Sequence, residues 1–295
     1  MSYACVVEPM RAANLLSGRA LYDIEHFATR DAVPSSGAAT AVADNNVGET
    51  PPLDYLFVVA GGDPAAYQDA KVFAWLGRMA RRGVLLGGVS GGPVILARAG
   101  LMSGRRMTVH WEHAQTLAEI SPGLLIEKSL YVIDRDRVTC AGGTAPLDMM
   151  HALIAHDLGT DFARRVSDWF LHTDIRPSSG AQRAGIVERV GTTSAPILDA
   201  VEAMENHIAD PLGLSDMAII AGVSPRQLNR LFRSRLGRST MSYYRHLRLE
   251  TAARLVTQSP LPLTEVALAT GFANSAHFSK AYSAEFGVPP SRMRK

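Results

Sequence analysis

The last hundred residues contain one pattern twice, and this repeat restricts the fold more than any other feature of the sequence. In each copy an apolar segment with helical spacing ends at a glycine, and a second amphipathic segment begins shortly afterwards. The two glycines, Gly222 and Gly271, are about fifty residues apart. Helix, glycine turn and helix form a compact helical unit, so the two copies predict an all-α domain over residues 196–295.

The residues after Gly222 are of the kinds that start a helix. Ser224 is a good N-terminal cap, and Pro225 suits the first helical position. Apolar residues then recur at helical spacing from Leu228 onward, which gives the second segment one buried face. Its polar face carries five candidate contact residues, which are Arg226, Gln227, Asn229, Arg230 and Arg233.

The second copy repeats these signals with different residues. Phe272 fills the angle after the glycine, and Asn274 is placed to cap the next helix. Aromatic residues from Phe278 onward line the inner face of that helix. The candidate contact residues at its start and on its outer face are Asn274, Ser275, His277, Ser279 and Lys280. Between the two copies, residues 242–257 predict one long helix that holds them at a fixed separation.

Positive charge is concentrated in the same part of the chain. The whole chain has a net charge of +2, but residues 226–254 contain eight arginines and a single acid, Glu250. Charge alone leaves two interpretations open. One is a solvated helical face, and the other is a surface that faces phosphates and gains affinity by releasing counterions.

The first half of the chain alternates short apolar runs with helical segments. Strands are predicted at residues 54–60, 83–88, 130–134 and 137–141, and helices at the N-terminus up to Gly18, at residues 65–82, just before Ala99 and at residues 146–158, with mostly loop at residues 29–52. This alternation indicates a doubly wound, flavodoxin-like α/β sheet with helices on both faces. The 295 residues suffice for about two domains. We expect an α/β domain at residues 1–172, a connection at residues 173–195 and the helical domain after it.

One segment of the α/β half has the form of a nucleophile elbow. Residues 88–92, Gly-Val-Ser-Gly-Gly, match G-x-S-x-G between a strand and a helix. A serine hydrolase built on Ser90 is one interpretation, and its partners would be drawn from His110, Glu112, His113, His151 and Asp157. The other interpretation is that small residues simply permit a tight turn there.

The helical half resembles the AraC/XylS family of regulators. The matching stretches are residues 224–232, 271–280 and 286–291. The resemblance implies that the second helix of each unit enters a major groove, the two grooves lying about one DNA turn, ~34 Å, apart. Arg226 and Arg230 would then read guanine and Asn229 adenine. Further arginines, Arg233, Arg238, Arg245 and Arg248, would hold phosphates or pair with acids.

The α/β half resembles the class I glutamine-amidotransferase-like, or PfpI-type, domain in the form fused to AraC-type tails. The matching stretches are residues 7–14, 60–62, 87–101, 108–112 and 141–144. Catalytic members carry Cys followed by His at the elbow, where this chain has Ser90 and Gly91. The resemblance therefore implies a domain that binds an effector and is not an enzyme. It also implies a first strand before the helix at Val6, which would lie upstream of Met1.

The whole pattern is most similar to regulators of arginine, choline, glycine betaine and carnitine catabolism. A quaternary ammonium is recognised by aromatic faces, for which Trp111 is a candidate, although a core position is its competing interpretation. A ligand carboxylate would sit at the helix N-terminus after Ser90. The candidate effector-binding residues are Glu8, Gly61, Gly62, Ser90, Gly91, His110, Trp111 and Glu112.

Together these features predict a cytoplasmic regulator, an activator, that associates with the nucleoid when bound to DNA. Its expected partners are double-stranded promoter DNA, a small nitrogenous effector, RNA polymerase and a second copy of itself. No apolar run reaches the ~18 residues of a membrane span, and the two cysteines, Cys5 and Cys140, indicate no disulfide framework. We expect no metal, cofactor or membrane contact. The alternatives are a serine hydrolase or amidase fused to a DNA-binding domain, and a DNA-binding module whose first half only dimerises.

Overall fold

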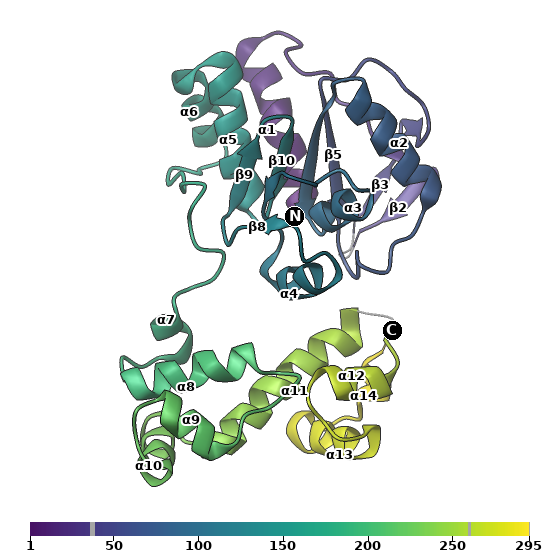
Figure 1. Ribbon diagram of the computed structural model, residues 1–295. Coiled ribbons are helices and arrows are strands. Elements are labelled where there is room, and N and C mark those ends of the chain that lie inside the picture. Colours follow the sequence, from purple (N-terminus) through teal and green to yellow (C-terminus); the bar gives the residue numbers. More distant parts are fainter. Residues whose placement is uncertain (36–38, 259–260, 295) are drawn as a thin grey trace. The chain divides into compact units, whose positions relative to one another are not determined.

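The chain divides into two compact units, Met1–Gln182 and Arg183–Lys295, in a computed structural model that describes residues 1–35, 39–258 and 261–294 (Figure 1). The division falls within the predicted connection at residues 173–195. None of the helices in the described ranges is long and apolar enough to cross a membrane.

The first unit is built on a four-stranded sheet in the order β5-β6-β10-β9. Its strands are β5 (Tyr55–Ala60), β6 (Leu85–Ser90), β10 (Arg137–Cys140) and β9 (Tyr131–Asp134). The first three are parallel, and β9 is antiparallel to β10. All four strands predicted from the sequence are confirmed, with β6 displaced by two residues toward the elbow.

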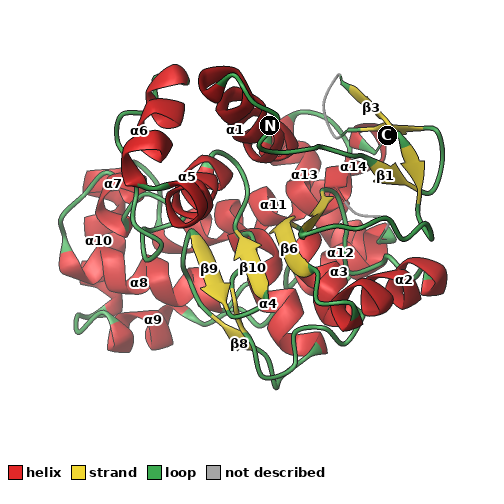
Figure 2. Ribbon diagram, turned by 90° about the horizontal axis from the view of Figure 1, so that it is seen from above, coloured by secondary structure: helices red, strands yellow, loops and turns green. Residues whose placement is uncertain are grey.

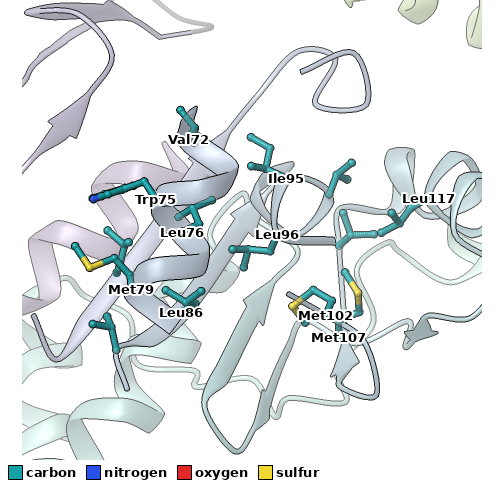
Figure 3. Close-up of a cluster of buried hydrophobic side chains, with 14 residues drawn as sticks. Val72, Trp75, Leu76, Met79, Leu86, Ile95, Leu96, Met102, Met107 and Leu117 are labelled. Carbon is teal, nitrogen blue, oxygen red and sulfur yellow. The ribbon is translucent and has the colours of Figure 1, made fainter. Parts of the chain in front are cut away.

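Helices cover both faces of this sheet, which confirms the doubly wound architecture (Figure 2). On one face lie α1 (Ser2–Ser17) and α5 (Ala145–Leu158), with α6 (Thr160–Trp169) packed against them. On the other lie α2 (Ala70–Arg81) and α3 (Gly92–Arg98). Figure 3 shows the core on this second face, where Leu76 and Met79 of α2 pack against Leu86 of β6. Both faces of the sheet are therefore buried, as the continuous apolar strands predict.

Some elements differ from the predictions. Residues 29–52, predicted as mostly loop, contain the short strands β2 (Ala32–Pro34), β3 (Thr40–Val42) and β4 (Asn45–Asn46). Strand β2 pairs with β3, and β4 pairs with β1 (Phe27–Ala28). Two more short strands, β7 (Arg106–Met107) and β8 (Leu125–Ile126), pair with each other. Helix α2 starts later than predicted because the Asp69 carboxylate caps it, accepting the backbone N–H groups of Lys71 and Val72. Helix α4 (Trp111–Ile120) was not predicted, and Leu117 is its single buried residue.

The second unit is all-helical, as predicted. Its elements are α7 (Ile186–Val190), α8 (Ala195–Asn206), α9 (Leu214–Ile220), α10 (Pro225–Leu236), α11 (Thr240–Gln258), α12 (Leu263–Ala269), α13 (Ser275–Phe286) and α14 (Pro290–Met293). The long helix α11 contributes to two separate cores. Tyr244 is buried with α8, α9 and α10, whereas Leu249 and Val256 are buried with α12 and α13. One continuous helix therefore joins the two helix-turn-helix units.

The residues of the predicted connection have defined contacts at both ends. Arg176 and Gln182 form hydrogen bonds within the first unit. In the second unit, Arg189 of α7 donates to the Glu205 carboxylate of α8. The segment just before the division is thus part of the α/β unit, because Arg176 is hydrogen-bonded to Asp148 and Gln182 to the Ser129 carbonyl.

Candidate nucleic-acid interface and ligand cavity

The first helix-turn-helix unit consists of α9 and α10, joined by a turn at Gly222. Gly222 has a φ of +65, in the left-handed region that favours glycine. Ser224 Oγ accepts the backbone N–H of Gln227 at 3.2 Å, which confirms the predicted cap. Leu228 and Phe232, on the inner face of α10, are fully buried. The opposite face exposes four of the five candidate contact residues, which are Arg226, Gln227, Arg230 and Arg233.

Asn229 is placed differently from its four neighbours. It is half-buried, and its Oδ1 accepts the backbone N–H of Thr240, the first residue of α11, at 3.0 Å. One of the four unpaired N–H groups at the start of that helix is satisfied in this way. The structure therefore gives Asn229 a capping role between α10 and α11, and its predicted contact with adenine has to be weighed against that role.

The second helix-turn-helix unit consists of α12 and α13. Its turn requires a glycine for two reasons, because Gly271 has a φ of +70 and a Cβ there would lie 2.5 Å from Pro211 Cγ. Asn274 Oδ1 accepts the backbone N–H of His277 at 2.8 Å, which confirms that Asn274 caps α13. His277 and Lys280 are exposed, while Ser275 and Ser279 are half-buried. The His277 ring also packs edge-on against Phe272.

Two clusters of polar side chains hold the second helix-turn-helix unit against α11. The Arg248 Nε donates to the Thr270 carbonyl at 2.8 Å, its Nη2 donates to the Gly271 carbonyl, and its guanidinium lies over the Phe272 ring. The sequence predicts a phosphate or an acid as the partner of Arg248, whereas in the structure its Nε and Nη2 are used by the backbone of the turn in the second helix-turn-helix unit. Side-chain contacts of Arg248 therefore hold the turn between α12 and α13 against α11.

Glu285 of α13 is the centre of the other cluster. It pairs with Arg238 at 3.0 Å, which confirms the prediction that Arg238 pairs with an acid, and with His246 Nδ1 at 2.7 Å. Partial burial opposes ionisation of this carboxyl, but the hydrogen bonds from Arg238 and His246 hold its pKa below the ordinary value.

The exposed arginines on α10 and α11 are available to a ligand. Arg226, Arg230, Arg233 and Arg245 form no ion pair with any residue that the structure describes. A surface of unpaired cations on the outer face of a helix is suited to bind phosphates and base edges.

In the first unit, the predicted elbow has the expected strand-turn-helix geometry. Ser90 ends β6 with a φ of +61, a left-handed conformation that is unusual for serine. The turn needs small neighbours, because a Cβ on Gly92 would lie 1.9 Å from the Val58 carbonyl oxygen, and one on Gly142 would lie 3.0 Å from Ser90 Oγ.

The hydrolase interpretation lacks a base beside this serine. No hydrogen bond joins Ser90 Oγ to an imidazole within the described part of the chain. His110 meets Ser90 through backbone atoms, donating its N–H to the Ser90 carbonyl at 3.4 Å. His151 instead bonds to Ser167, and Asp157 to Tyr55. The elbow therefore has the strand-turn-helix shape of a nucleophilic site, and its serine is not hydrogen-bonded to an imidazole in the described residues.

A cavity of about 190 Å³ lies beside the elbow. Its walls come from the start of α4, the loop between β10 and α5, and the segment before the division between the units. The lining residues are His110, Trp111, Leu130, Ala141, Gly142, Gly143, Thr144, Ala145, Arg176 and Gln182. This volume is below the ~300 Å³ of sites for drug-sized ligands and a little above the ~150 Å³ that holds benzene. It suits a small metabolite.

Two of the eight predicted effector residues, His110 and Trp111, line this cavity, and Ser90 lies against its wall at Gly142. The others are placed outside the wall. The Glu8 carboxylate pairs with Arg11. Gly91 packs against Pro64, and the exposed Gly61 and Gly62 follow β5. Glu112 lies 3.6 Å from His110 Nδ1, measured to its Oε2.

Sequence reasoning does not single out Arg176 and Gln182, two polar residues in the wall. Arg176 donates from Nε and Nη2 to the Asp148 carboxylate, at 3.0 and 2.6 Å, and from Nη2 to Thr144 Oγ1 at 3.0 Å. Asp148 is fully buried and also accepts from His172 Nε2. Both residues lie in a stretch that has loop composition, where no periodicity marks which side chains turn inward.

The aromatic wall is formed by neighbouring rings. The His110 and Trp111 ring centroids are 5.4 Å apart. Burial lowers the pKa of His110, which Glu112 partly opposes, and burial likewise lowers the pKa of His113. This wall is therefore uncharged at neutral pH and presents ring faces to a ligand.

Known proteins resemble both halves of the chain. Residues 7–156 match the DJ-1/PfpI family, and residues 217–295 match a family described as a helix-turn-helix domain. The HTH-type transcriptional regulator GlxA of Rhizobium meliloti (strain 1021) is 46% identical over 100% of this chain and 92% of its own length. The HTH-type transcriptional regulator CdhR of Pseudomonas aeruginosa is 38% identical over 100% of this chain and 88% of its own. A crystal structure of an AraC family transcriptional regulator from Pseudomonas putida is 26% identical, with a TM-score of 0.51, over 57% of this chain and 91% of that one.

Proposed function

Because the chain belongs to the family of HTH-type transcriptional regulators that join a DJ-1/PfpI domain to an AraC-type DNA-binding domain, we propose that it regulates promoters in response to a small nitrogenous metabolite. The DNA-binding half is the part that the family membership establishes. The effector, the residues that contact DNA, the oligomeric state and the effect on transcription are the parts that we propose.

The observation that carries the proposal for DNA contacts is the pair of outward faces on α10 and α13. Arg226, Gln227, Arg230 and Arg233 are exposed on the first, and His277 and Lys280 on the second. Bidentate contact with guanine requires an unpaired guanidinium, and Arg226 forms no ion pair with the residues that the structure describes. We propose that these residues read bases and that Arg245 contacts phosphate. Asn274, Ser275 and Ser279 lie at the start and side of α13, where backbone and phosphate contacts are made.

The test begins by selecting genomic fragments that bind the purified full chain, followed by footprinting of the enriched sequence. We expect two protected major-groove segments about one turn, ~34 Å, apart. Arg226→Ala should weaken binding by about 1–3 kcal/mol and relax the preference at one base pair, whereas Arg245→Ala should weaken all sequences about equally. Arg19→Ala, an exposed arginine of the other unit, is the matched control. Unchanged base preference in Arg226→Ala would remove that residue from base readout.

The cavity of the first unit supports the effector proposal. It joins uncharged aromatic faces at His110 and Trp111 to the guanidinium of Arg176, a combination that recognises a molecule with an ammonium at one end and an anion at the other. A ligand that binds only the folded chain stabilises it by RT ln(1 + [L]/Kd) and so raises its melting temperature. A thermal-shift series of amino acids, amines and betaines tests this, and the absence of any shift would contradict it.

We further propose that the first unit does not catalyse a reaction. The support is the replacement of Cys-His by Ser90-Gly91 and the absence of a hydrogen-bonded base beside Ser90 in the described residues. An activity-based serine probe should label the wild-type chain no more than Ser90→Ala. Selective labelling of the wild type would favour the alternative, a serine hydrolase or amidase fused to a DNA-binding domain.

We propose that the regulator acts as a homodimer and that it recruits RNA polymerase. A dimer is expected because two copies would double the operator length that is read. Sedimentation of the protein with and without operator DNA tests the dimer. Transcription in vitro from the selected promoter, with and without the protein, distinguishes activation from repression, and activation is the expected result.

A further inference from the structure

The two helix-turn-helix units touch directly, as well as sharing the long helix α11 (Figure 1). The turn of the second helix-turn-helix unit packs against the segment between α8 and α9. A Cβ on Gly271 would lie 2.8 Å from the Ile208 carbonyl oxygen and 2.5 Å from Pro211 Cγ. The turn that precedes α13 is therefore held by a steric contact against the loop that enters the first helix-turn-helix unit.

An ion pair connects the other end of α13 to the first helix-turn-helix unit. Arg238 lies between α10 and α11, and its Nη1 donates to Glu285 Oε1 at 3.0 Å. Glu285 is the residue before the last of α13. His246 of α11 places its Nδ1 2.7 Å from the same oxygen and its Nε2 3.5 Å from Glu250. The Glu285 carboxylate therefore joins α13 both to α11 and to the loop that follows α10.

The steric contact and the ion pair act far apart along the second helix-turn-helix unit. Helix α13 has 12 residues, so at 1.5 Å per residue it is about 18 Å long. A helix that is held at one end can swing about that end, and the 19 residues of α11 can bend gently. An ion pair at the far end of α13 opposes both movements, so it favours one separation and one angle between α13 and α10.

We propose that Glu285 is a positioning residue for DNA recognition. By pairing with Arg238 it sets the separation of α10 and α13, and the protein thereby selects operators whose two major-groove segments have the matching spacing. Glu285 acts through Arg238 and contacts no DNA itself. This inference rests on the proposed contacts of the outward faces of α10 and α13 with DNA.

An operator with altered spacing either breaks the ion pair or has to be deformed itself. One inserted base pair moves the second major-groove segment by about 3.4 Å along the DNA axis and rotates it by about 34°. An ion pair is lost once its nitrogen and oxygen are more than about 4 Å apart. The Glu285 side chain is 24% exposed and has a second partner in His246. A pair in this setting contributes up to about fivefold to an equilibrium constant.

The test measures operator affinity as a function of spacing. The two footprinted segments are kept, the sequence between them is shortened or lengthened by one base pair, and the Kd of the full chain is measured by fluorescence anisotropy. We expect the wild type to bind the native spacing most tightly. In Glu285→Gln the ratio of the Kd at altered spacing to the Kd at native spacing should fall by about three- to fivefold.

The ratio separates positioning from a loss of stability. Partial unfolding lowers the apparent affinity for every operator by the same factor, so it leaves the ratio unchanged. Glu265→Gln is the matched control, because it removes the same charge from an exposed residue in the first turn of α12. Its ratio should equal that of the wild type. An unchanged ratio in Glu285→Gln, or an equal fall in Glu265→Gln, would overturn the proposal.

Arg238→Gln assigns the effect to the ion pair. Arg238 is 42% exposed, so its substitution tests the pair even if Glu285→Gln unfolds. Each single change should lower the ratio, and the double variant should lower it no further, because both changes remove one interaction. Additive effects of the two changes would overturn the role of the pair.

Failure of this inference is distinguishable from failure of the proposed DNA contacts. If the variants bind operator and keep the wild-type spacing ratio, only the positioning role of Glu285 is wrong. If the full chain enriches no genomic fragment, the proposed contacts are wrong and this inference is wrong with them.

Discussion

Removing Arg176 should destabilise the first unit more than removing any surface arginine. Its side chain is 36% exposed, but the Asp148 carboxylate that it pairs with has an exposure of 0%. Arg176→Met leaves that buried carboxylate with two donors, His172 Nε2 and the backbone N–H of residue 176, at 2.8 and 2.9 Å. The change therefore removes the charge-compensating partner and keeps part of the hydrogen bonding.

The expected loss can be estimated from these contacts. Breaking a buried ion pair by removing one partner costs about 3–5 kcal/mol. Since two hydrogen bonds to Asp148 remain and Arg176 is partly exposed, we expect about 2–3 kcal/mol. For a unit of this size each kcal/mol lowers the melting temperature by about 2–4 °C, so the transition of the first unit should fall by about 4–12 °C.

The assay is differential scanning calorimetry of the full chain, together with urea unfolding. Arg106→Met is the matched control, because its pair with Glu127 at 3.3 Å has side chains 57% and 36% exposed, and such pairs contribute about 0–1 kcal/mol. Adding Asp148→Asn to Arg176→Met should recover part of the loss, since the buried charge is then removed. Equal melting temperatures for Arg176→Met and Arg106→Met would refute the reasoning.

Three further predictions concern the other contacts. Asn229→Ala should lower the free energy of unfolding of the second unit by about 1 kcal/mol, because the N–H at the start of α11 loses its acceptor, while base preference stays unchanged; altered base preference in operator selection would restore Asn229 to base readout. Gly271→Ala should cost about 1–3 kcal/mol, because its φ of +70 is strained for alanine and Pro211 is too close, and urea unfolding measures this; a stabilised variant would show that the turn is wrongly described. Effector affinity should be constant above the ordinary histidine pKa of about 6.5 and fall as the pH drops through the lowered pKa of His110 and of His113, since protonation places positive charge beside the ligand's ammonium; calorimetry across this range would contradict the assignment if affinity rose toward acid.

The elements set by local signals were predictable from the sequence. Ser224 and Asn274 cap their helices as expected, because a capping residue acts on N–H groups only two or three positions away. The strand β5 is marked by a continuous apolar run, which indicates burial on both faces. Local signals of this kind do not depend on how the rest of the chain packs.

The elements set by distant contacts were not predictable. Asn229 has the spacing of an outward residue but turns toward Thr240, eleven residues away. Gln182 bonds to residues more than fifty positions away, and nothing in its local sequence marks it as part of a cavity. The predicted ligand site was centred on the elbow, whereas the cavity lies beside it, because Arg176 and Gln182 close a space that the sequence does not show.

A ligand bound in the first unit is expected to change DNA binding by the second. The most direct test is fluorescence anisotropy of a selected operator fragment titrated with the full chain, with and without a saturating concentration of the metabolite that gives the largest thermal shift. Coupling between two sites in one protein is usually about 1–3 kcal/mol, so we predict that the Kd for operator changes by at least about fivefold. By reciprocity, operator DNA must change the affinity for that metabolite by the same factor. An operator Kd that stays the same while calorimetry shows the metabolite bound would contradict this coupling.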